Sequence, residues 1–249
     1  MRWVSMRVIK VGGSVLENLE KVFKPEIFRD AVVVHGGSRY VDELAKKLGL
    51  NVEKLTSPSG VTFRRTTRKV LDVYIAAVMK ANRELVSFLR RQGIEAIGVS
   101  GVKEVIIGRR KKLIKAVING KIMAIRDDYS GIIKEVNVEM IRNYMKVGVP
   151  VIAPIAYDPV ENVPLNVDGD KVAYHVALAL KSRELYFLSD TAFLINGEVI
   201  DKIPRNRIEE YFPYSSGGMR KKLLMAKKAI ESGVERVIIE GLNGRTVIS

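Results

Sequence analysis

Short β-branched apolar runs alternate with amphipathic segments along most of this 249-residue chain. The apolar runs predict strands at Arg7–Val11, Ala31–His35, Ala96–Val99, Val149–Ile155, Glu184–Leu188 and Arg236–Ile239. The amphipathic segments predict helices at Tyr40–Leu48, Thr66–Gln92, Val138–Val147, Asp168–Leu180 and Met219–Ser232. Strands that alternate with helices favour an open, mainly parallel sheet covered by helices on both faces, so we predict an α/β fold.

The stretch from Glu104 to Lys134 has a different pattern. Its short β-rich runs are broken by Gly, Asn-Gly and Asp-Asp, which are turn signals. We expect antiparallel β-hairpins appended to the main sheet. A composition shift at Tyr157–Pro164 predicts a boundary between an N-terminal lobe, residues 1–160, and a C-terminal lobe, residues 161–249.

Composition excludes several kinds of chemistry. The chain has no cysteine, which excludes disulfides, thiolate metal sites and cysteine nucleophiles. It has only two histidines, so a histidine-rich metal site is not expected. No apolar run is long enough to span a bilayer, and no stretch near the start has the form of a signal peptide. We therefore expect a soluble cytoplasmic protein with no membrane partner.

The formal net charge of +14 favours an anionic partner, such as nucleic acid, a phosphorylated ligand or an acidic protein. Nucleic acid is the first candidate from charge alone. The sequence has no zinc-ligand spacing, no aromatic RNA-recognition signature and no basic tail, which argues against it. The alternative is that part of the charge only keeps the protein soluble.

Two glycine pairs directly follow predicted strands, in KVGG (Lys10 to Gly13) and in HGG (His35 to Gly37). Ligands of open α/β sheets bind beyond the carboxyl ends of the strands. Glycines there leave backbone N–H groups open to an anion at a helix start, and Lys10 would complete a phosphate site. A tight turn is the alternative. The common P-loop and the GxGxxG dinucleotide loop are both missing.

Other residues near these strand ends are less specific. Gly101 also follows a predicted strand. His35 is expected to be a hydrogen-bonded positioning residue rather than a catalytic base. Arg39 is either a ligand-binding or a plain surface residue.

Polar residues also cluster at two predicted helix starts. Asn166, Asp168 and Asp170 precede one helix, either as an N-cap or as a polar cluster aimed at the cleft. The D-x-D spacing is that of a calcium loop, but the later glutamate of an EF-hand is missing. Lys221 and Lys222 lie in the first turn of the last helix, where cations oppose the helix dipole unless an anion binds there.

The loop Ser57–Thr67 leads into the longest predicted helix and carries two adjacent arginines, Arg64 and Arg65. Either one can clamp a carboxylate with two parallel hydrogen bonds. The sequence does not separate this role from that of an ordinary surface arginine.

Taken together, these stretches resemble the amino acid kinase family. The resemblance covers nearly the whole chain and follows the order of the family's motifs. The matching stretches are Lys10 to Ser14, His35 to Gly37, Arg64, Asn166 to Asp170, and Gly217 to Lys222. The resemblance implies a three-layer αβα sandwich whose N-terminal lobe binds the phosphoryl acceptor and dimerises, and whose C-terminal lobe binds ATP.

Within the family, the chain resembles the acetylglutamate kinase branch, and more closely the archaeal kinases of lysine and arginine biosynthesis. HGGSRYVDELAKKLG, SPSG and RDDYSGIIKEVN carry this finer resemblance. Those enzymes phosphorylate aminoadipate or glutamate attached to an acidic carrier protein, LysW, which would suit a strongly basic kinase. At Ser100 to Glu104 the chain has SGVKE where many relatives have SGVDG or SGLDG. The long N-terminal helix of hexameric relatives is also missing, so a homodimer is expected.

The resemblance implies transfer of the γ-phosphoryl group of ATP to a carboxylate, with Mg²⁺ bridging the phosphates and few protein ligands to the metal. Lys10 would stabilise the transferring group, Lys222 would act near the leaving ADP, and Asp170 would orient both lysines. The implied substrate-binding residues are Gly36, Gly37, Arg64 and Asn166, and the implied nucleotide-binding residues are Gly12, Gly13, Ser189, Asp190 and Lys222.

Three alternatives stay open. The first is an N-acetylglutamate kinase that uses the free acetylated amino acid. Because its catalytic residues would be the same, only a basic docking area around the substrate opening would distinguish the two, with Arg39, Arg64, Arg65 and Arg109–Lys112 as candidates. The second is a family member that phosphorylates a nucleotide or a small phosphate. The third is a nucleic-acid-binding protein.

Overall fold

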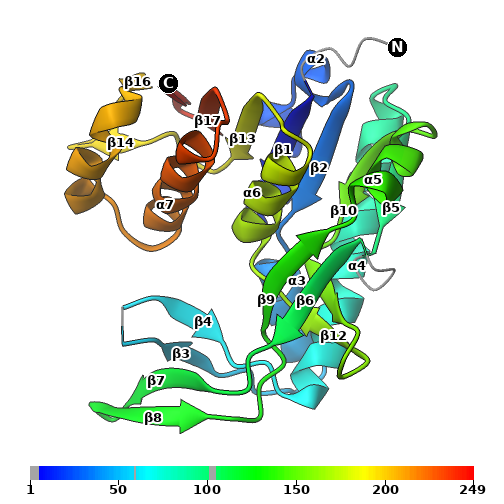
Figure 1. Cartoon of the computed structure of the whole chain (residues 1–249), viewed down its shortest axis with the longest axis vertical. Helices are drawn as coiled ribbons and strands as arrows, with labels where there is room; N and C mark the ends of the chain where they lie inside the picture. The colour runs from blue at the N-terminus through cyan, green and yellow to red at the C-terminus, as the bar shows by residue number, and fades with distance from the viewer. Residues whose placement is uncertain (1–5, 59, 101–104) are drawn as a thin grey trace.

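One eight-stranded sheet forms the centre of the computed structural model, which describes residues 6–58, 60–100 and 105–249 (Figure 1). Its strands are β1 (Arg7–Val11), β2 (Ala31–His35), β5 (Ala96–Val99), β10 (Val149–Ile152), β13 (Glu184–Leu188), β16 (Lys202–Ile203), β17 (Arg236–Gly241) and β18 (Gly244–Ile248). Their order is β16-β18-β17-β13-β1-β2-β10-β5. All neighbours are parallel except β17 and β18, so the predicted mainly parallel sheet is confirmed.

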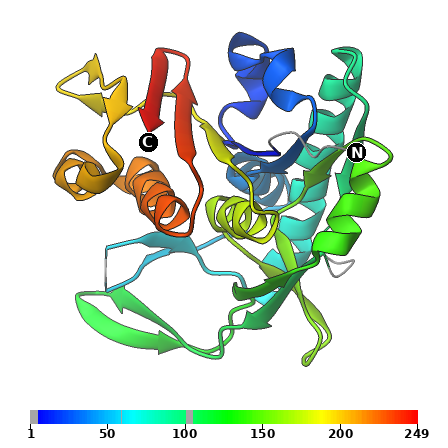
Figure 2. The ribbon, with the colours of Figure 1, turned by 45° about the horizontal axis from the view of Figure 1, so that its top comes forward.

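Helices cover both faces of this sheet (Figure 2). The helices on one face are α5 (Val138–Met145), α6 (Gly169–Ala179) and α7 (Gly217–Glu231). The other face is covered by η1 (Leu16–Asn18), α1 (Leu19–Val22), α2 (Pro25–Phe28) and the second half of α4 (Arg68–Arg91). Side chains of successive strand residues point to opposite faces of the sheet. Val8 belongs to the core under α5, α6 and α7, and Ile9 belongs to the core under α1, α2 and α4.

All five predicted helices are present, with ends shifted by no more than two residues. The remaining predicted helix is α3 (Ser38–Lys47), which starts directly after Gly37 and packs against α4. The N-cap of α4 is Thr67, whose hydroxyl accepts from the N–H of Val70. The N-cap of α6 is Asp168, whose carboxylate accepts from two backbone N–H groups. These caps fix where each helix begins.

The predicted strand Val149–Ile155 is too long. It ends at Ile152, and Ile155 begins β11 (Ile155–Asp158) in a different sheet. Pro154 lies between them and has no N–H to continue the ladder. The second sheet has the order β12-β11-β6-β9, with β12 (Val163–Asn166), β6 (Ile106–Arg110) and β9 (Gly131–Val136).

A third sheet projects from the body as an arm, which we define as β3 (Lys54–Thr56), β4 (Thr62–Arg64), β7 (Ile114–Ile118) and β8 (Lys121–Ile125) (Figures 1 and 2). The β7–β8 hairpin turns at Asn119 and Gly120, both with positive φ, as two-residue hairpin turns require. The expectation of antiparallel hairpins between residues 104 and 134 is thus correct. Their attachment is not as predicted, because these strands belong to the two four-stranded sheets and not to the central sheet.

Several elements were not predicted, among them α2, β3, β4, β12, β14 (Leu194–Ile195), β15 (Glu198–Val199), β16, β18 and η3 (Arg205–Tyr214). The central sheet runs through both predicted lobes, because β1 pairs with β13. Gly101 and most of the Ser100–Glu104 loop lie outside the described residues. Within the described residues, none of the helices has the length and apolar character needed to cross a membrane.

Candidate active site

Two glycine loops meet where the parallel strands β1, β2 and β13 end. The N–H of Gly12 donates to the carbonyl of Leu188, and the N–H of Gly36 donates to the carbonyl of Val11, each over 2.8 Å. The loops after β1 and β2 therefore extend the sheet by one more hydrogen bond before they leave it. This brings the KVGG and HGG motifs side by side.

Close packing explains three of the four glycines. A Cβ on Gly12 would lie 2.9 Å from the carbonyl oxygen of Leu188, and a Cβ on Gly36 would lie 2.9 Å from the backbone nitrogen of Gly13. A Cβ on Gly37 would lie 2.7 Å from Cγ1 of Val78 on α4. Each of these distances is too short for a side chain. At these positions glycine is needed for the close approach of the chain itself.

Gly13 is different, because a Cβ there would meet no hard clash. It would lie 3.4 Å from the backbone nitrogen of Gly37 and 3.5 Å from that of Ser38. The hydrogen bonds of the described residues leave the N–H groups of Gly13, Gly37 and Ser38 without an acceptor. We call these three groups the N–H cluster. Converging backbone N–H groups at a helix start suit an anion with several oxygens, such as a phosphate.

His35 lies behind this cluster and is fully buried. Its Nδ1 is 2.8 Å from the carbonyl oxygen of Gly36, and its Nε2 is 3.1 Å from the amide nitrogen of Asn82. Burial lowers the pKa of His35 to about 4, so the ring is neutral at neutral pH. These contacts agree with the expected positioning role and leave no free ring nitrogen for proton transfer.

A buried ion pair flanks the N–H cluster. Nζ of Lys10, on β1, lies 2.7 Å from Oδ1 of Asp170 in the first turn of α6. Burial alone would raise the pKa of Asp170, but the charges of Lys10 and Lys222 outweigh it and hold this pKa below its usual value. Two cations therefore share one buried carboxylate.

Lys222 is the second of these cations and belongs to α7. Burial lowers the pKa of its ammonium group, and the charge of Asp170 only partly opposes that effect. Lys222 is not within ion-pair distance of Asp170, so the pairing expected from the resemblance is a contact only for Lys10. The adjacent Lys221 lies 3.8 Å from Oδ2 of Asp168. The arrangement leaves Lys222 buried with an incompletely compensated positive charge.

Ser189 and Asp190 follow β13 at the same edge of the sheet. The N–H of Ser189 donates to the carbonyl of Glu240, and the hydroxyl of Ser14 donates to Oδ2 of Asp190 over 2.6 Å. The negative charge of the Asp190 carboxylate raises the pKa of Lys222 and so opposes part of the effect of burial. Both predicted residues thus border the KVGG loop.

Arg64 and Asn166, the predicted acceptor-binding residues, lie at the ends of β4 and β12. Arg64, at the end of β4, places Nη1 2.7 Å from Oδ1 of Asp42 and donates from Nη2 to the carbonyl of Ser38 over 3.2 Å. It therefore lies against the start of α3, next to the N–H cluster. Asn166, at the end of β12, donates to the hydroxyl of Thr66 over 2.9 Å. The Thr66 hydroxyl in turn donates to the carbonyl of Arg64.

Sequence reasoning missed the buried residue that fixes this corner. Both carboxylate oxygens of Asp128 are used: Oδ2 accepts from the N–H of Thr66 over 2.8 Å and Oδ1 from the N–H of Ser130 over 2.7 Å. Asp128 lies in the RDDYSG stretch, whose only signal in the sequence is the family resemblance. Its role depends on chain crossings that the sequence does not reveal.

Among residues 6–58, 60–100 and 105–249, no group of three or more His, Asp or Glu side chains is placed to hold a metal ion. The geometry instead combines open N–H groups with buried cations. Such a site can bind and stabilise a polyphosphate with few side-chain oxygen ligands.

The chain belongs to the amino acid kinase family, whose model matches residues 5–241. It is 68% identical over 98% of its length to a Pyrococcus abyssi protein provisionally named LysW-aminoadipate/LysW-glutamate kinase, the whole of which is covered. A Saccharolobus islandicus LysW-aminoadipate/LysW-glutamate kinase is 38% identical over 98% of this chain and 96% of its own length. Among solved structures, smu.665 from Streptococcus mutans is similar with a TM-score of 0.78 at 23% identity, covering 98% of both chains.

Proposed function

We propose that this kinase transfers the γ-phosphoryl group of ATP to the side-chain carboxylate of glutamate or 2-aminoadipate whose amino group is attached to the acidic carrier protein LysW. The product is an acyl phosphate. The N–H cluster beside Lys10, Asp170 and Lys222 is the observation that carries the chemical part of the proposal. The names of the relatives support the choice of acceptor.

The acceptor chemistry fits the residues at the site. A carboxylate with an ordinary pKa of about 4 is ionised at neutral pH and needs no general base. The buried, neutral His35 offers none. What the reaction needs is compensation of charge, because an anionic acceptor must approach an anionic phosphoryl group.

Positive groups would surround the transferring phosphoryl group. The N–H cluster would bind its oxygens, with Lys10 on the acceptor side and Lys222 on the side of the leaving ADP. Asp170 would keep both ammonium groups in place without accepting a proton. Positioned charges and dipoles of this kind supply most of the rate in phosphoryl transfer. Mg²⁺, when bound together with ATP, would neutralise charge on the β- and γ-phosphates.

The acceptor would bind at the Arg64 and Asn166 corner. Arg64 lies beside the N–H cluster and would pair with the α-carboxylate of the amino acid. Its present partner, Asp42, is 40% exposed in the side chain, so the pair is open to exchange with a competing carboxylate. Asn166 would contact the same end of the acceptor.

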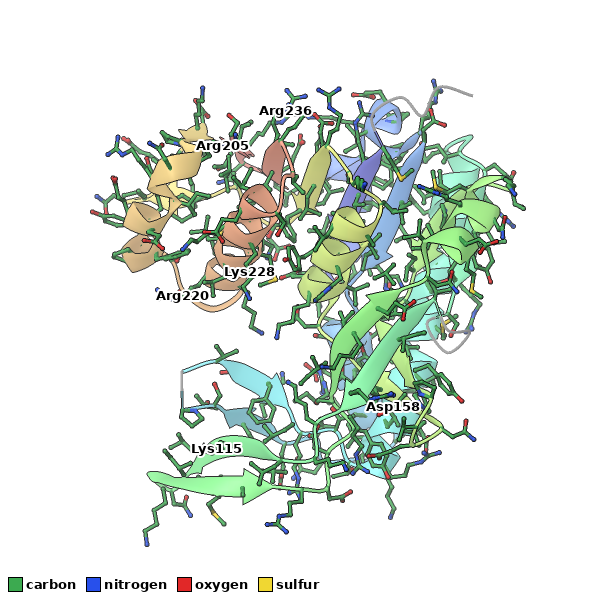
Figure 3. All side chains as sticks on the ribbon, viewed as in Figure 1. Lys115, Asp158, Arg205, Arg220, Lys228 and Arg236 are labelled. Carbon is green, nitrogen blue, oxygen red and sulfur yellow. The ribbon has the colours of Figure 1, made fainter. Side chains whose placement is uncertain are left out.

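Most of the basic residues that were considered for docking an acidic carrier are paired internally. Arg39 pairs with Glu17, Arg64 with Asp42, Arg65 with Glu53, Arg109 with Asp158 and Arg110 with Glu161. Lys111 and the adjacent Lys112 form no ion pair with a described carboxylate. These two lysines lead from β6 into the arm, and we propose them as docking cations. Figure 3 shows two further basic side chains, Lys115 on the arm and Arg220 on α7.

Trapping of the acyl phosphate with hydroxylamine tests the proposal. The acceptors to compare are LysW-linked glutamate, LysW-linked aminoadipate and free N-acetylglutamate, each with Mg-ATP. Turnover restricted to the linked acceptors is the expected result. Efficient turnover of free N-acetylglutamate would move the assignment to that acceptor, and no turnover with any of the three would refute a carboxylate kinase.

The remaining proposals concern organisation. We propose that residues 1–160 bind the acceptor and form a homodimer, that residues 161–249 bind ATP, and that the enzyme acts in the cytoplasm. Sedimentation of the purified chain tests the dimer.

A further inference from the structure

Asn82 is a polar side chain in the middle of α4 that is 1% exposed. Its amide nitrogen lies 2.8 Å from the carbonyl oxygen of Val151 and 3.1 Å from Nε2 of His35. A buried amide is costly unless its hydrogen bonds are made, so these contacts hold Asn82 in one orientation. Its oxygen faces Gly98, where a Cβ would be only 2.3 Å away.

The contacts of Asn82 and the carbonyl of Gly36, which can only accept, together determine where the proton of His35 lies. If the amide of Asn82 were turned around, two acceptors, its own oxygen and the carbonyl of Val151, would face each other. The amide nitrogen therefore points at both partners and donates to them. Nε2 of His35 must then accept and carry no proton. The neutral ring has its one proton on Nδ1, which donates to the carbonyl of Gly36 over 2.8 Å.

The hydrogen bond to Gly36 has a consequence on the far side of the same peptide unit. The carbonyl of Gly36 and the N–H of Gly37 belong to one trans peptide and point in opposite directions. Because His35 holds the carbonyl toward the core, the N–H of Gly37 points away from the core. It thereby joins the open N–H groups of Gly13 and Ser38.

We propose that Asn82 is a positioning residue for phosphoryl transfer: it fixes the Nδ1–H tautomer of His35 and so aims the N–H of Gly37 at the transferred phosphoryl group. Neither Asn82 nor His35 touches the substrate. The kinetic part rests on the proposed function, but the tautomer and its effect on the loop do not. A relay of three hydrogen bonds thus connects the interior of α4 to the reacting group.

The tautomer can be measured without any enzyme assay. The chain has only two histidines, so a long-range ¹⁵N–¹H correlation spectrum shows two imidazole rings, and the variant His175→Gln assigns them. For wild-type protein at neutral pH, we expect His35 to show a protonated Nδ1 and an unprotonated Nε2. In Asn82→Leu, which has no donor, we expect signal from the Nε2–H tautomer to grow.

Kinetics test the connection to the loop. Loss of one oriented N–H donor costs about 10²–10³ in kcat where it has been measured, so we expect Asn82→Leu to lower kcat by about tenfold to a hundredfold. KM for the acceptor should change little. His35→Phe should lower kcat to a similar extent. The double variant should be no slower than His35→Phe alone, because Asn82 acts only through His35.

Ser182→Ala is the matched control for stability. Ser182 is also buried, and its hydroxyl lies 2.7 Å from the carbonyl oxygen of Met6 and 2.8 Å from that of Glu184, at the opposite end of β13. Its loss should lower stability without changing kcat or the His35 spectrum. This separates positioning from general destabilisation.

Three results would overturn the proposal. The first is a wild-type His35 that is protonated at Nε2. The second is an Asn82→Leu variant with unchanged kcat or an unchanged ring spectrum. The third is a double variant whose losses simply multiply. If wild-type protein phosphorylates none of the carboxylate acceptors, the proposed function fails, while the spectrum still decides whether Asn82 fixes the tautomer.

Discussion

Nζ of Lys10 lies 2.7 Å from Oδ1 of Asp170, so a single ion pair joins the end of β1 to the first turn of α6. Both side chains are 10% exposed. Removing one partner of such a pair leaves an uncompensated buried charge. Here it would leave two, because Lys222 also depends on the charge of Asp170.

Asp170→Asn is therefore expected to be more harmful than loss of an ordinary ion pair. We expect unfolding free energy to fall by about 3 kcal/mol and kcat by at least about a hundredfold, since both lysines lose their common counter-ion. Urea unfolding and the hydroxylamine assay measure the two effects. Glu209→Gln, which breaks an exposed pair with Lys227, is the control and should change neither. Equal effects of the two substitutions would contradict this account.

Gly13→Val should abolish activity and leave the fold intact. The Cβ would lie in ordinary contact, 3.4 Å and 3.5 Å, with the backbone nitrogens of Gly37 and Ser38, and the added methyl groups would hinder an anion from reaching them. We expect a normal circular dichroism spectrum, a cooperative thermal transition and no acyl phosphate. Gly12→Val is the contrast, because its Cβ would press on the carbonyl of Leu188, and it should destabilise the protein. An active Gly13→Val enzyme would show that the N–H cluster does not contact the phosphates.

The lowered pKa of Lys222 predicts an alkaline limit to activity. A lysine ordinarily loses its proton near pH ~10.4, and burial makes Lys222 lose it at a lower pH in the free enzyme. Because its positive charge is needed, kcat/KM for ATP should fall as pH rises through that lower value. In Lys222→Arg this fall of kcat/KM at high pH should disappear, because arginine keeps its proton there, although the overall rate of the variant will be lower. Lys228→Arg makes the same change at an exposed position of α7 and should leave the fall of kcat/KM at high pH unchanged.

Lys111 and Lys112, which form no ion pair with a described carboxylate, predict a specific defect in carrier recognition. We expect Lys111→Ala with Lys112→Ala to raise KM for LysW-linked acceptors by about tenfold, with little change in kcat, because docking charges act mainly on association. The same double substitution at Lys46 and Lys47, at the end of α3, keeps the net charge equal and should have no such effect. The difference between the pairs should shrink as salt is added. A defect common to both pairs would indicate only a dependence on net charge.

β1 and β2 were predictable because each is a short, mainly β-branched run that is almost fully buried, and β13 is an equally buried run of large apolar residues. β1, β2, β5 and β13 have the predicted bounds. The arm was harder, because β3 and β4 have three residues each and no clear apolar pattern. β18 was also missed, although Asn243-Gly244 at its start is a hairpin signal.

The site residues were predictable as far as backbone chemistry and helix starts reveal them. Paired glycines after strands and acidic residues before α6 reflect what the backbone needs at those points, so the sequence displays them directly. The residues that hold these loops in position could not be predicted from the sequence. Asn82 and Asp128 are polar residues that the sequence pattern alone does not distinguish from surface residues. Only the fold shows that one reaches His35 and the other reaches Thr66.

The place of β1 in the sheet also sets the order in which the site can form during synthesis. β1 pairs with β2 on one side and with β13 on the other, and the N–H of Gly12 is bonded to Leu188. A ribosome adds about 5–20 residues per second, so β1 has an unpaired edge for roughly 10–30 seconds before β13 emerges. The nascent chain cannot bind nucleotide in the proposed way during this time, and the open edge of β1 is exposed to mispairing.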